Sequence, residues 1–308
     1  MSRWPSHPPA GRIAYVDGRY VRHGEAGVHI EDRGLQLGDS VYEVCRIADG
    51  RLIDIEEHLD RLERSLGEIE MAMPMGRGAL KSVMAEIARR NGMRDGLLYL
   101  QVTRGALRRD HPIPAAAPKP TLILTVHPVD QAAVARRHAE GVAIITCPDE
   151  RWGRCDIKST QLLANLLAKT AAHRAGVYEA WLVGQDGFVT EGASTTAWIV
   201  DGEGRVVTRD LSRAILPGVT RRVILEAAAE AQMPVLERSF TREEAAGARE
   251  AFLSSATGGA VPVVAIDGRK VGDGRPGPLT RRVMALYAQH SQEPVAQRKL
   301  RRNPHIRI

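Results

Sequence analysis

The stretch Arg154-Cys155-Asp156-Ile157-Lys158-Ser159-Thr160 stands directly before a segment in which leucines gather on one side of a helix. The spacing of Leu162, Leu163, Leu166 and Leu167 predicts an amphipathic helix over 161–175. A mostly apolar strand is expected over 142–147, on the other side of the stretch. Lys158 therefore lies between a strand and a helix. A lysine at a helix entrance is commonly just solvated, but an amine held there is also available for covalent catalysis.

Strands and helices are expected in turn along the rest of the chain. Asp17-Gly18 and Asp49-Gly50 are hairpin signals, and four prolines make 104–120 a long exposed loop. The segment 128–140 fits a linker or an irregular helix, and Asp32-Arg33-Gly34 fits a turn after 28–30. The other expected elements are strands at 13–16, 19–22, 41–48, 51–55, 97–103 and 121–127, and helices at 56–70, 78–91 and 221–232.

Length and composition favour a two-domain globular protein. The chain has 308 residues, of which 44% are hydrophobic and 26% charged. We expect a leader over 1–12, a smaller α/β domain over 13–130, a larger domain over 131–290 and a basic flexible tail over 291–308. No apolar run approaches the roughly 18 residues that a membrane span needs, so no membrane partner is expected.

Charge and cysteine content exclude other classes. The formal net charge is +6, but five basic residues after position 297 account for most of it, so the body is nearly neutral. With only three Phe for base stacking, nucleic-acid binding is not expected. Cys45, Cys147 and Cys155 have no metal-ligand spacing, which favours a reduced, cytoplasmic protein without a structural metal.

Further candidates have both an ordinary and a functional interpretation. Glu191, at a strand end beside Gly192, is either a turn residue or a carboxylate that faces a protonated ring nitrogen. The stretch 215–220 opens a helix whose free N–H groups suit a phosphate, and 254–259 is a second hydroxyl-rich turn. Arg61 either lies on a helix surface or supplies a bidentate guanidinium.

Taken in order, these stretches resemble the fold-type IV pyridoxal-phosphate enzymes, within the D-amino-acid aminotransferase branch of the class IV aminotransferases. The resemblance extends from Ile13 to about Tyr287. It implies a smaller N-terminal α/β domain and a larger C-terminal domain with a pseudo-barrel of strands and flanking helices. The stretches that carry it are 31–34, 38–43, 58–62, 101–105, 154–160, 190–192 and 216–221.

The resemblance implies pyridoxal 5′-phosphate as the cofactor and assigns roles to several residues. Lys158 matches the Schiff-base lysine and proton shuttle, and Glu191 matches the partner of the pyridine nitrogen. Similar enzymes often have threonine where this chain has Ala256, which leaves a backbone contact there. The implied phosphate ligands are Arg61, Val219, Thr220, Ser255, Ala256 and Thr257.

For the substrate, the resemblance implies that Tyr42 and an Arg-x-His pair bind the α-carboxylate. Arg109 and His111 fit that pair, with Arg108 one residue before it. In similar enzymes the pair comes from the partner subunit, so a homodimer is expected. The implied reaction is ping-pong transamination between D-alanine and 2-oxoglutarate, which gives pyruvate and D-glutamate.

Other functions stay open at this point. Branched-chain aminotransferases have the same fold but typically place a tyrosine five residues after the lysine, where this chain has Leu163. Aminodeoxychorismate lyases use the same scaffold, and (R)-selective amine transaminases lack a carboxylate trap such as Arg109 and His111. A basic binding protein without catalysis, acting through residues 298–308, is the alternative from a different class.

Overall fold

The computed structural model describes residues 11–113, 115 and 118–293. Most of the expected leader, 1–12, and of the expected tail, 291–308, lies outside these residues. The described chain forms two compact units. Unit 1 contains the residues up to 129 together with 157–162, and unit 2 contains 130–156 and the residues from 163 onward. The segment 157–162, with Lys158, thus groups with unit 1, although the sequence suggested a place in the second domain.

Unit 1 is built on an antiparallel sheet whose strands lie in the order β2-β1-β6-β5-β3-β4. Asp17 and Gly18, both with positive φ, form the turn between the first two strands. The strands are β1 (Ile13–Val16), β2 (Arg19–Arg22), β3 (Ser40–Ala48), β4 (Arg51–Leu52), β5 (Gly96–Thr103) and β6 (Thr121–Pro128).

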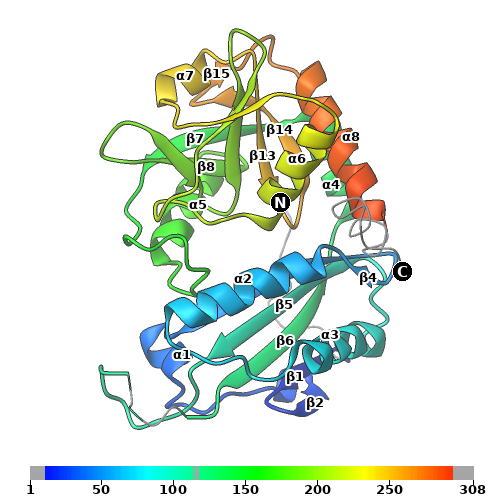
Figure 1. Ribbon diagram of the computed structural model, residues 1–308, viewed down its shortest axis with the longest axis vertical. Coiled ribbons are helices and arrows are strands. Elements are labelled where there is room, and N and C mark those ends of the chain that lie inside the picture. Colours follow the sequence, from blue (N-terminus) through cyan, green and yellow to red (C-terminus); the bar gives the residue numbers. More distant parts are fainter. Residues whose placement is uncertain (1–10, 114, 116–117, 294–308) are drawn as a thin grey trace, which may run out of the picture. The chain divides into compact units, whose positions relative to one another are not determined.

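The helices of unit 1 cover this sheet. Figure 1 shows α2 (Ile55–Glu68) lying across the strands, where it packs on β3, while α3 (Arg77–Arg90) packs on β1 and β6. The apolar residues of α2 recur every three or four positions and join alternating residues of β3 in one buried core. The remaining helices are the 3-10 helix η1 (His23–Glu25) and the short α1 (Arg33–Leu37).

Unit 2 contains a larger mixed sheet in which β7 runs parallel to both its neighbours, β14 and β8, and β11 runs parallel to β12, while the other pairs are antiparallel. Its order is β12-β11-β10-β13-β14-β7-β8-β9, and β15 pairs with β14. The strands are β7 (Val142–Pro148), β8 (Glu179–Val183), β9 (Val189–Gly192), β10 (Thr196–Val200), β11 (Val206–Thr208), β12 (Val235–Glu237), β13 (Glu250–Ser255), β14 (Gly259–Ile266) and β15 (Arg269–Lys270). Strands β9, β10 and β11 are buried along their whole length, as expected of a sheet covered on both faces.

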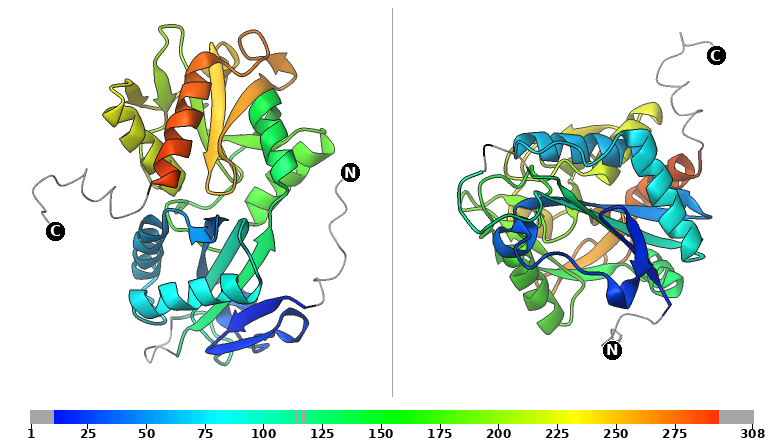
Figure 2. Two further views of the ribbon diagram at one scale, coloured as in Figure 1. Left: turned by 90° about the vertical axis from the view of Figure 1, so that its right-hand side faces the viewer. Right: turned by 90° about the horizontal axis from the view of Figure 1, so that it is seen from below.

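The helices of unit 2 pack on this sheet. Helices α6 (Val219–Glu230) and α8 (Pro278–Gln292) lie side by side (Figures 1 and 2) and bury an apolar core with β10, β13 and β14. Helix α5 (Leu163–Arg174) packs on β8 and β7, and α4 (Gln131–Glu140) packs on β14. The short α7 (Arg242–Ala246) begins with a capping box formed by Thr241 and Glu244. Among the described residues, no helix is both long and apolar enough to cross a bilayer.

Three local expectations differ from the structure. The strand expected over 51–55 ends at Leu52, and Ile55 is already the first residue of α2. Asp32-Arg33-Gly34 is the start of α1, because the Asp32 side chain caps the helix by accepting from the Gly34 N–H at 2.8 Å. The segment 128–140 contains a regular helix, α4, whose N-cap Asp130 accepts from the Ala133 N–H at 2.9 Å. Both helices depend on a capping aspartate, a local signal that hydrophobic periodicity does not register.

Candidate active site

Lys158 lies beside the first residues of β3 in unit 1. The Tyr42 N–H donates to the Lys158 carbonyl at 3.0 Å, the Lys158 N–H donates to Ser65 Oγ at 3.3 Å, and Ser159 forms a β-bridge with Val41. These bonds fix the backbone on both sides of the lysine. Its Nζ lies 4.1 Å from the centre of the Tyr42 ring. Within the described chain no carboxylate pairs with this amine, so it is available to react with a carbonyl group.

Tyr42 belongs to an aromatic pair. Its ring stacks on that of Tyr99 with centroids 5.7 Å apart, and the Tyr99 hydroxyl donates to Gln101 Oε1 at 2.9 Å. Burial, together with the neighbouring Tyr42, raises the pKa of Tyr99 to about 12. Tyr99 therefore stays neutral and supports Tyr42 by stacking and packing.

Arg61 is buried on α2 and fixed by Glu43 of β3. Its Nε and Nη2 donate to the two Glu43 oxygens, both at 2.8 Å, and His58 Nδ1 lies 2.7 Å from the same carboxylate. Burial alone would raise the pKa of Glu43, but the charge and hydrogen bonds of Arg61 and His58 hold it at about 2. Glu43 is therefore a permanent anion that orients the Arg61 guanidinium from within unit 1.

Arg109 and His111 lie in the loop that follows β5, also in unit 1. Both side chains are exposed, and the described chain gives neither of them a hydrogen bond to Tyr42. The loop is held to the rest of unit 1 through its backbone instead. Within a single chain, then, the predicted carboxylate-binding residues project outward.

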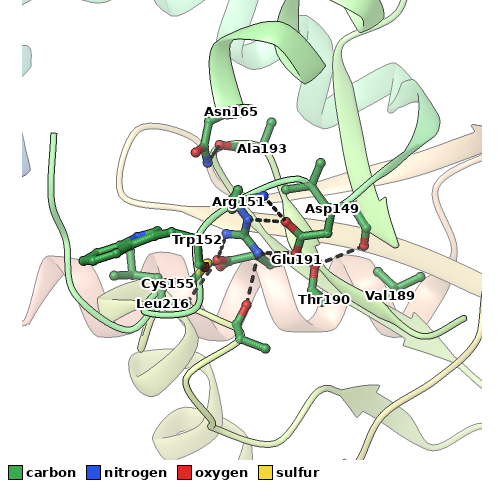
Figure 3. A network of polar contacts seen from close by, with 12 residues as sticks. Asp149, Arg151, Trp152, Cys155, Asn165, Val189, Thr190, Glu191, Ala193 and Leu216 are labelled. Atoms are coloured by element: carbon green, nitrogen blue, oxygen red, sulfur yellow. Dashed lines mark hydrogen bonds and ion pairs between the residues drawn. The ribbon is translucent and has the colours of Figure 1, made fainter. Parts of the chain in front are cut away.

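Glu191 is buried at the end of β9 in unit 2 (Figure 3). Its Oε1 accepts from the Leu216 N–H at 3.1 Å and from Nη1 of Arg151. Arg151 also binds Asp149 in bidentate fashion, with Nε to Oδ1 at 2.9 Å and Nη2 to Oδ2 at 2.8 Å. The Ala214 carbonyl accepts a further bond from Arg151 at 3.0 Å. One guanidinium thus joins two carboxylates and the chain that leads to α6.

The three charged side chains of this cluster are buried, with exposed fractions of 7% for Arg151, 8% for Glu191 and 11% for Asp149. Burial opposes ionisation of Asp149, but the hydrogen bonds and charge of Arg151 lower its pKa below the usual value. Arg151 thus holds the two carboxylates in place. A buried site of this kind suits a cationic ring N–H.

The sequence analysis missed Asp149 and Arg151. They directly follow the apolar strand β7 and precede Lys158 by only a few positions, and charged residues at a strand end were the available signal. Arg151 and its partner Glu191 are 40 positions apart, so no local sequence pattern indicates that they meet.

The start of α6 has features that suit an anion. The N-cap Gly218 provides no side-chain cap, so the first N–H groups of this helix lack a side-chain acceptor. The Thr220 Oγ1 is buried and has no hydrogen-bond partner. A Cβ on Gly218 would lie 3.0 Å from Thr196 Oγ1, which a real side chain would have to displace. A phosphate fits this combination of open amides, an unpaired hydroxyl and a residue without a side chain.

The turn that follows β13 lies next to β10, the strand that contains Thr196. Thr196 pairs with Ser254 across β10 and β13, which brings 255–257 close to the residue that flanks Gly218. Ser255 Oγ lies 3.0 Å from Thr257 Oγ1 and accepts from the Gly258 N–H at 3.2 Å. Ala256 has only its backbone to offer. The second predicted phosphate contact of unit 2 is therefore adjacent to the first.

Comparisons with known proteins agree with this chemistry. A family model described as amino-transferase class IV matches residues 40–266. The chain is 40% identical to a D-alanine aminotransferase of Bacillus licheniformis over 87% of this chain and 93% of that protein. It is 38% identical to a D-alanine aminotransferase of Listeria innocua over 89% of this chain and 94% of that protein.

The fold agrees as well. The structure matches a crystal structure of Escherichia coli branched-chain amino acid aminotransferase with a TM-score of 0.83 and 24% identity, over 92% of this chain and 97% of that one. At this identity the likeness concerns the fold alone, and it confirms the expected mixed α/β fold of these aminotransferases. Because the family model spans well over half of the sequence and the relatives cover nearly all of it, the chain belongs to the class IV aminotransferase family.

Proposed function

We propose that this enzyme transfers the amino group of D-alanine, or of a similar D-amino acid, to 2-oxoglutarate and yields pyruvate and D-glutamate by a ping-pong mechanism. The observation that carries this proposal is the 35–40% identity, over about nine-tenths of the chain, to several relatives named D-alanine aminotransferase. The exposed Arg109 and His111 support it, since a guanidinium and an imidazole suit an α-carboxylate.

The enzyme is a pyridoxal-phosphate transaminase, as class IV aminotransferases are. The residues of this chain fit the cofactor, because unit 2 offers a buried anion beside a phosphate-sized site with an unpaired hydroxyl. When bound, pyridoxal phosphate supplies an aldehyde that accepts an amine and a protonated ring that withdraws electrons from the substrate α-carbon.

In this proposal Lys158 carries the covalent and proton-transfer steps. Its Nζ would hold the cofactor covalently and, once free, would accept the proton from the substrate α-carbon. The backbone bonds to Tyr42 and Ser65 keep the lysine Cα in place while the side chain moves. The Tyr42 ring beside Nζ limits the directions from which a substrate approaches.

Glu191 would hold the ring N–H, while Arg151 binds Glu191 and is itself bound by Asp149. A buried carboxylate favours the protonated ring over the neutral one. The proposed phosphate ligands are Arg61, Val219, Thr220 and the turn Ser255-Ala256-Thr257. Val219 and Ala256 act through their backbone N–H groups, while Thr220 contributes its unpaired hydroxyl.

We further propose a homodimer in which Arg109 and His111 of one subunit complete the site of the other together with Tyr42. Large apolar side chains are exposed on α5 and on the part of unit 1 next to the Arg109 loop, as subunit interfaces require. Leu163 is 72% exposed and Ile30 is 75% exposed. The other members of these two groups are Leu166, Leu167, Val28, Leu35 and Ile113. A cytoplasmic location, also proposed, agrees with the three free cysteines.

The alternatives on this fold are less favoured. Branched-chain aminotransferases resemble the structure in fold only, and Leu163 is exposed at the position where they typically have a tyrosine. No specific observation favours a lyase, an amine transaminase or a basic binding protein. The hypothesis of a basic binding protein depends on residues 298–308, which lie outside the described part of the chain.

A donor screen tests the proposal. Purified enzyme is assayed with 2-oxoglutarate as acceptor against D-alanine, L-alanine, D-leucine and L-leucine, with pyruvate or the matching oxo acid as readout. We expect D-alanine to be the best of the four donors. Faster turnover of L-leucine would refute the D-specific assignment.

A variant separates the covalent role from substrate choice. Lys158→Ala should lose both turnover and the visible absorbance of the lysine-bound cofactor, whereas Lys169→Ala, on α5, should keep both. Turnover by Lys158→Ala would refute the role of this amine. Arg109→Ala should raise the KM for D-alanine, and unchanged kinetics would remove Arg109 from the carboxylate site.

A further inference from the structure

The loop after β5 is attached to unit 1 near its base. Ala106 forms an isolated β-bridge with Asp32, and the Leu107 N–H donates to the Glu31 carbonyl at 3.3 Å. Beyond this point the chain is exposed from Arg108 through Ile113. An exposed stretch of this kind has many accessible backbone conformations unless something fixes it.

Arg33 reaches this exposed stretch from the start of α1. Its Nη1 donates to the Asp110 carbonyl at 2.7 Å and its Nη2 lies 3.4 Å from the His111 carbonyl. Its own backbone N–H donates to the Gly105 carbonyl at 3.0 Å. The guanidinium therefore contacts two successive backbone carbonyls, those of Asp110 and His111, immediately after Arg109.

Arg33 is itself fixed. Its side chain is 5% exposed, and its Nε donates to Asp39 Oδ2 at 2.8 Å. The same oxygen accepts from Arg104 Nε at 2.7 Å. Burial works against ionisation of Asp39, but the hydrogen bonds of Arg104 and Arg33 lower its pKa below the usual value. The carboxylate stays charged and keeps the two guanidiniums in place.

Arg104 also binds Asp39 but holds a different segment of the chain. Its Nη1 donates to the Glu70 carbonyl at 3.1 Å and its Nη2 to the Ile69 carbonyl at 2.5 Å, at the end of α2. It is 3% exposed, so it is as buried as Arg33. Two similar arginines on one carboxylate thus hold two different segments, and only Arg33 holds the loop of Arg109 and His111.

We propose that Arg33 is a positioning residue for the substrate carboxylate, because it holds the Asp110–His111 backbone so that Arg109 and His111 present their side chains in a fixed arrangement. The inference rests on the proposed function, in which these two residues bind the α-carboxylate. A planar guanidinium suits the task since it binds several acceptors in fixed directions at once. Arg33 touches neither substrate nor cofactor in this proposal and acts only through the loop.

The test compares two donors that differ in the carboxylate. D-Alaninamide has a neutral amide where D-alanine has its carboxylate, so it does not depend on the Arg109 and His111 pair. We expect Arg33→Gln to lower kcat/KM for D-alanine roughly ten- to a hundredfold, chiefly through KM, because a loop shifted by about 1 Å misplaces its contacts. The value for D-alaninamide should stay unchanged.

Arg104→Gln is the matched control. It removes an equally buried guanidinium from the same Asp39 but leaves the bonds to Asp110 and His111. The preference for D-alanine over D-alaninamide should fall in Arg33→Gln and persist in Arg104→Gln. An equal fall in both variants would overturn the proposal, since it would trace the effect to Asp39 or to general stability.

A second variant and a second measurement keep the test valid if Arg33→Gln folds poorly. Arg33→Lys keeps the charge beside Asp39 but cannot span both carbonyls, so its donor preference should also fall, by less. Trypsin should cut the holoenzyme after Arg108 or Arg109 faster in the Arg33 variants than in Arg104→Gln, as mapped by mass spectrometry. If the unaltered enzyme fails to transaminate D-alanine, the proposed function fails. If it is active and the Arg33 variants keep its donor preference and cleavage rate, only this inference fails.

Discussion

Substitution of Arg151 by methionine tests how the Glu191 cluster is balanced. The change keeps much of the side-chain volume but removes the bidentate bonds to Asp149 at 2.9 and 2.8 Å and the bond to Glu191. The two buried carboxylates then lose the guanidinium that joins them. Breaking a buried ion pair by removing one partner costs about 3–5 kcal/mol. We expect the free energy of unfolding at pH 7 to fall by that order.

The loss should depend on pH, and its sign follows from Asp149. In the unaltered protein the pKa of Asp149 is lowered, so its contribution to stability is present above about pH 3.8 and is lost as the pH falls through the folded-state value. Without Arg151, burial raises the pKa above the unfolded value. The carboxyl then opposes folding as the pH rises. The unaltered protein keeps most of its contribution over this range, so the gap between variant and unaltered protein should widen from pH 4 to pH 7.

Urea unfolding from pH 4 to pH 7 measures this gap. Trp181 and Trp198 are fully buried in unit 2, so tryptophan fluorescence reports on the unit that contains the cluster. Cofactor-loaded and cofactor-free forms are both measured, since loss of cofactor alone would also lower stability. Arg205→Met is the control, because it removes an arginine that binds one oxygen of Asp201 at a more exposed site, and it should have a much smaller effect.

The result that would refute the reasoning is a gap of equal size at both ends of this range. Such a result would mean that Arg151 stabilises by packing alone. Arg151→Lys sharpens the comparison, because it keeps one positive charge without the planar guanidinium. In Arg151→Lys the gap to the unaltered protein should vary little with pH, but the free energy of unfolding should recover only in part.

Three further outcomes are expected. Thr220→Val should weaken cofactor binding roughly ten- to a hundredfold by equilibrium titration without lowering the stability of the cofactor-free protein, because its buried hydroxyl has no partner to lose. The control is Thr208→Val, which removes a hydroxyl that donates to the Ala197 carbonyl at 3.0 Å. This control should lower the stability of the cofactor-free protein and leave cofactor binding unchanged. Leu166→Glu should give a monomer by light scattering with little D-alanine turnover, and an active dimer would argue against this face as the interface. Glu43, whose pKa is held at about 2, should contribute stability that is lost between about pH 4.5 and 2, and Glu43→Gln should abolish that part of the acid transition in urea titrations.

Local sequence patterns predicted much of the framework. The hairpin β1–β2 lies within the expected residues, because Asp17-Gly18 favours the positive φ values that its turn requires. Helix α2 begins one residue before the expected range and ends two before its end, since its leucines face the sheet at regular spacing. Helix α4 lacks this signal because Val134 is its only buried residue, so the sequence alone suggested a linker.

The candidate site was predictable only in part, for a physical reason. Lys158, Glu191 and the start of α6 lie in short stretches whose residue types together resemble a family. The residues that hold them are distant in the sequence and meet them only in the folded structure. Glu43 meets Arg61 across 18 positions, Arg151 meets Glu191 across 40, and Arg33 meets the Asp110 carbonyl across 77.

These supporting contacts share one feature that bears on the chemistry. Each is a buried arginine with an acidic partner, Arg61 with Glu43, Arg151 with Asp149 and Glu191, or Arg33 with Asp39. Burying a charge is costly unless it is paired, so each arginine is held in one orientation by the penalty of leaving its partner. A group that must meet a phosphate, a ring nitrogen or a carboxylate at a fixed place benefits from such rigidity more than from additional affinity. Arg33→Gln and Arg151→Met should therefore differ in kind: the first should change donor preference, and the second the stability of the cofactor site.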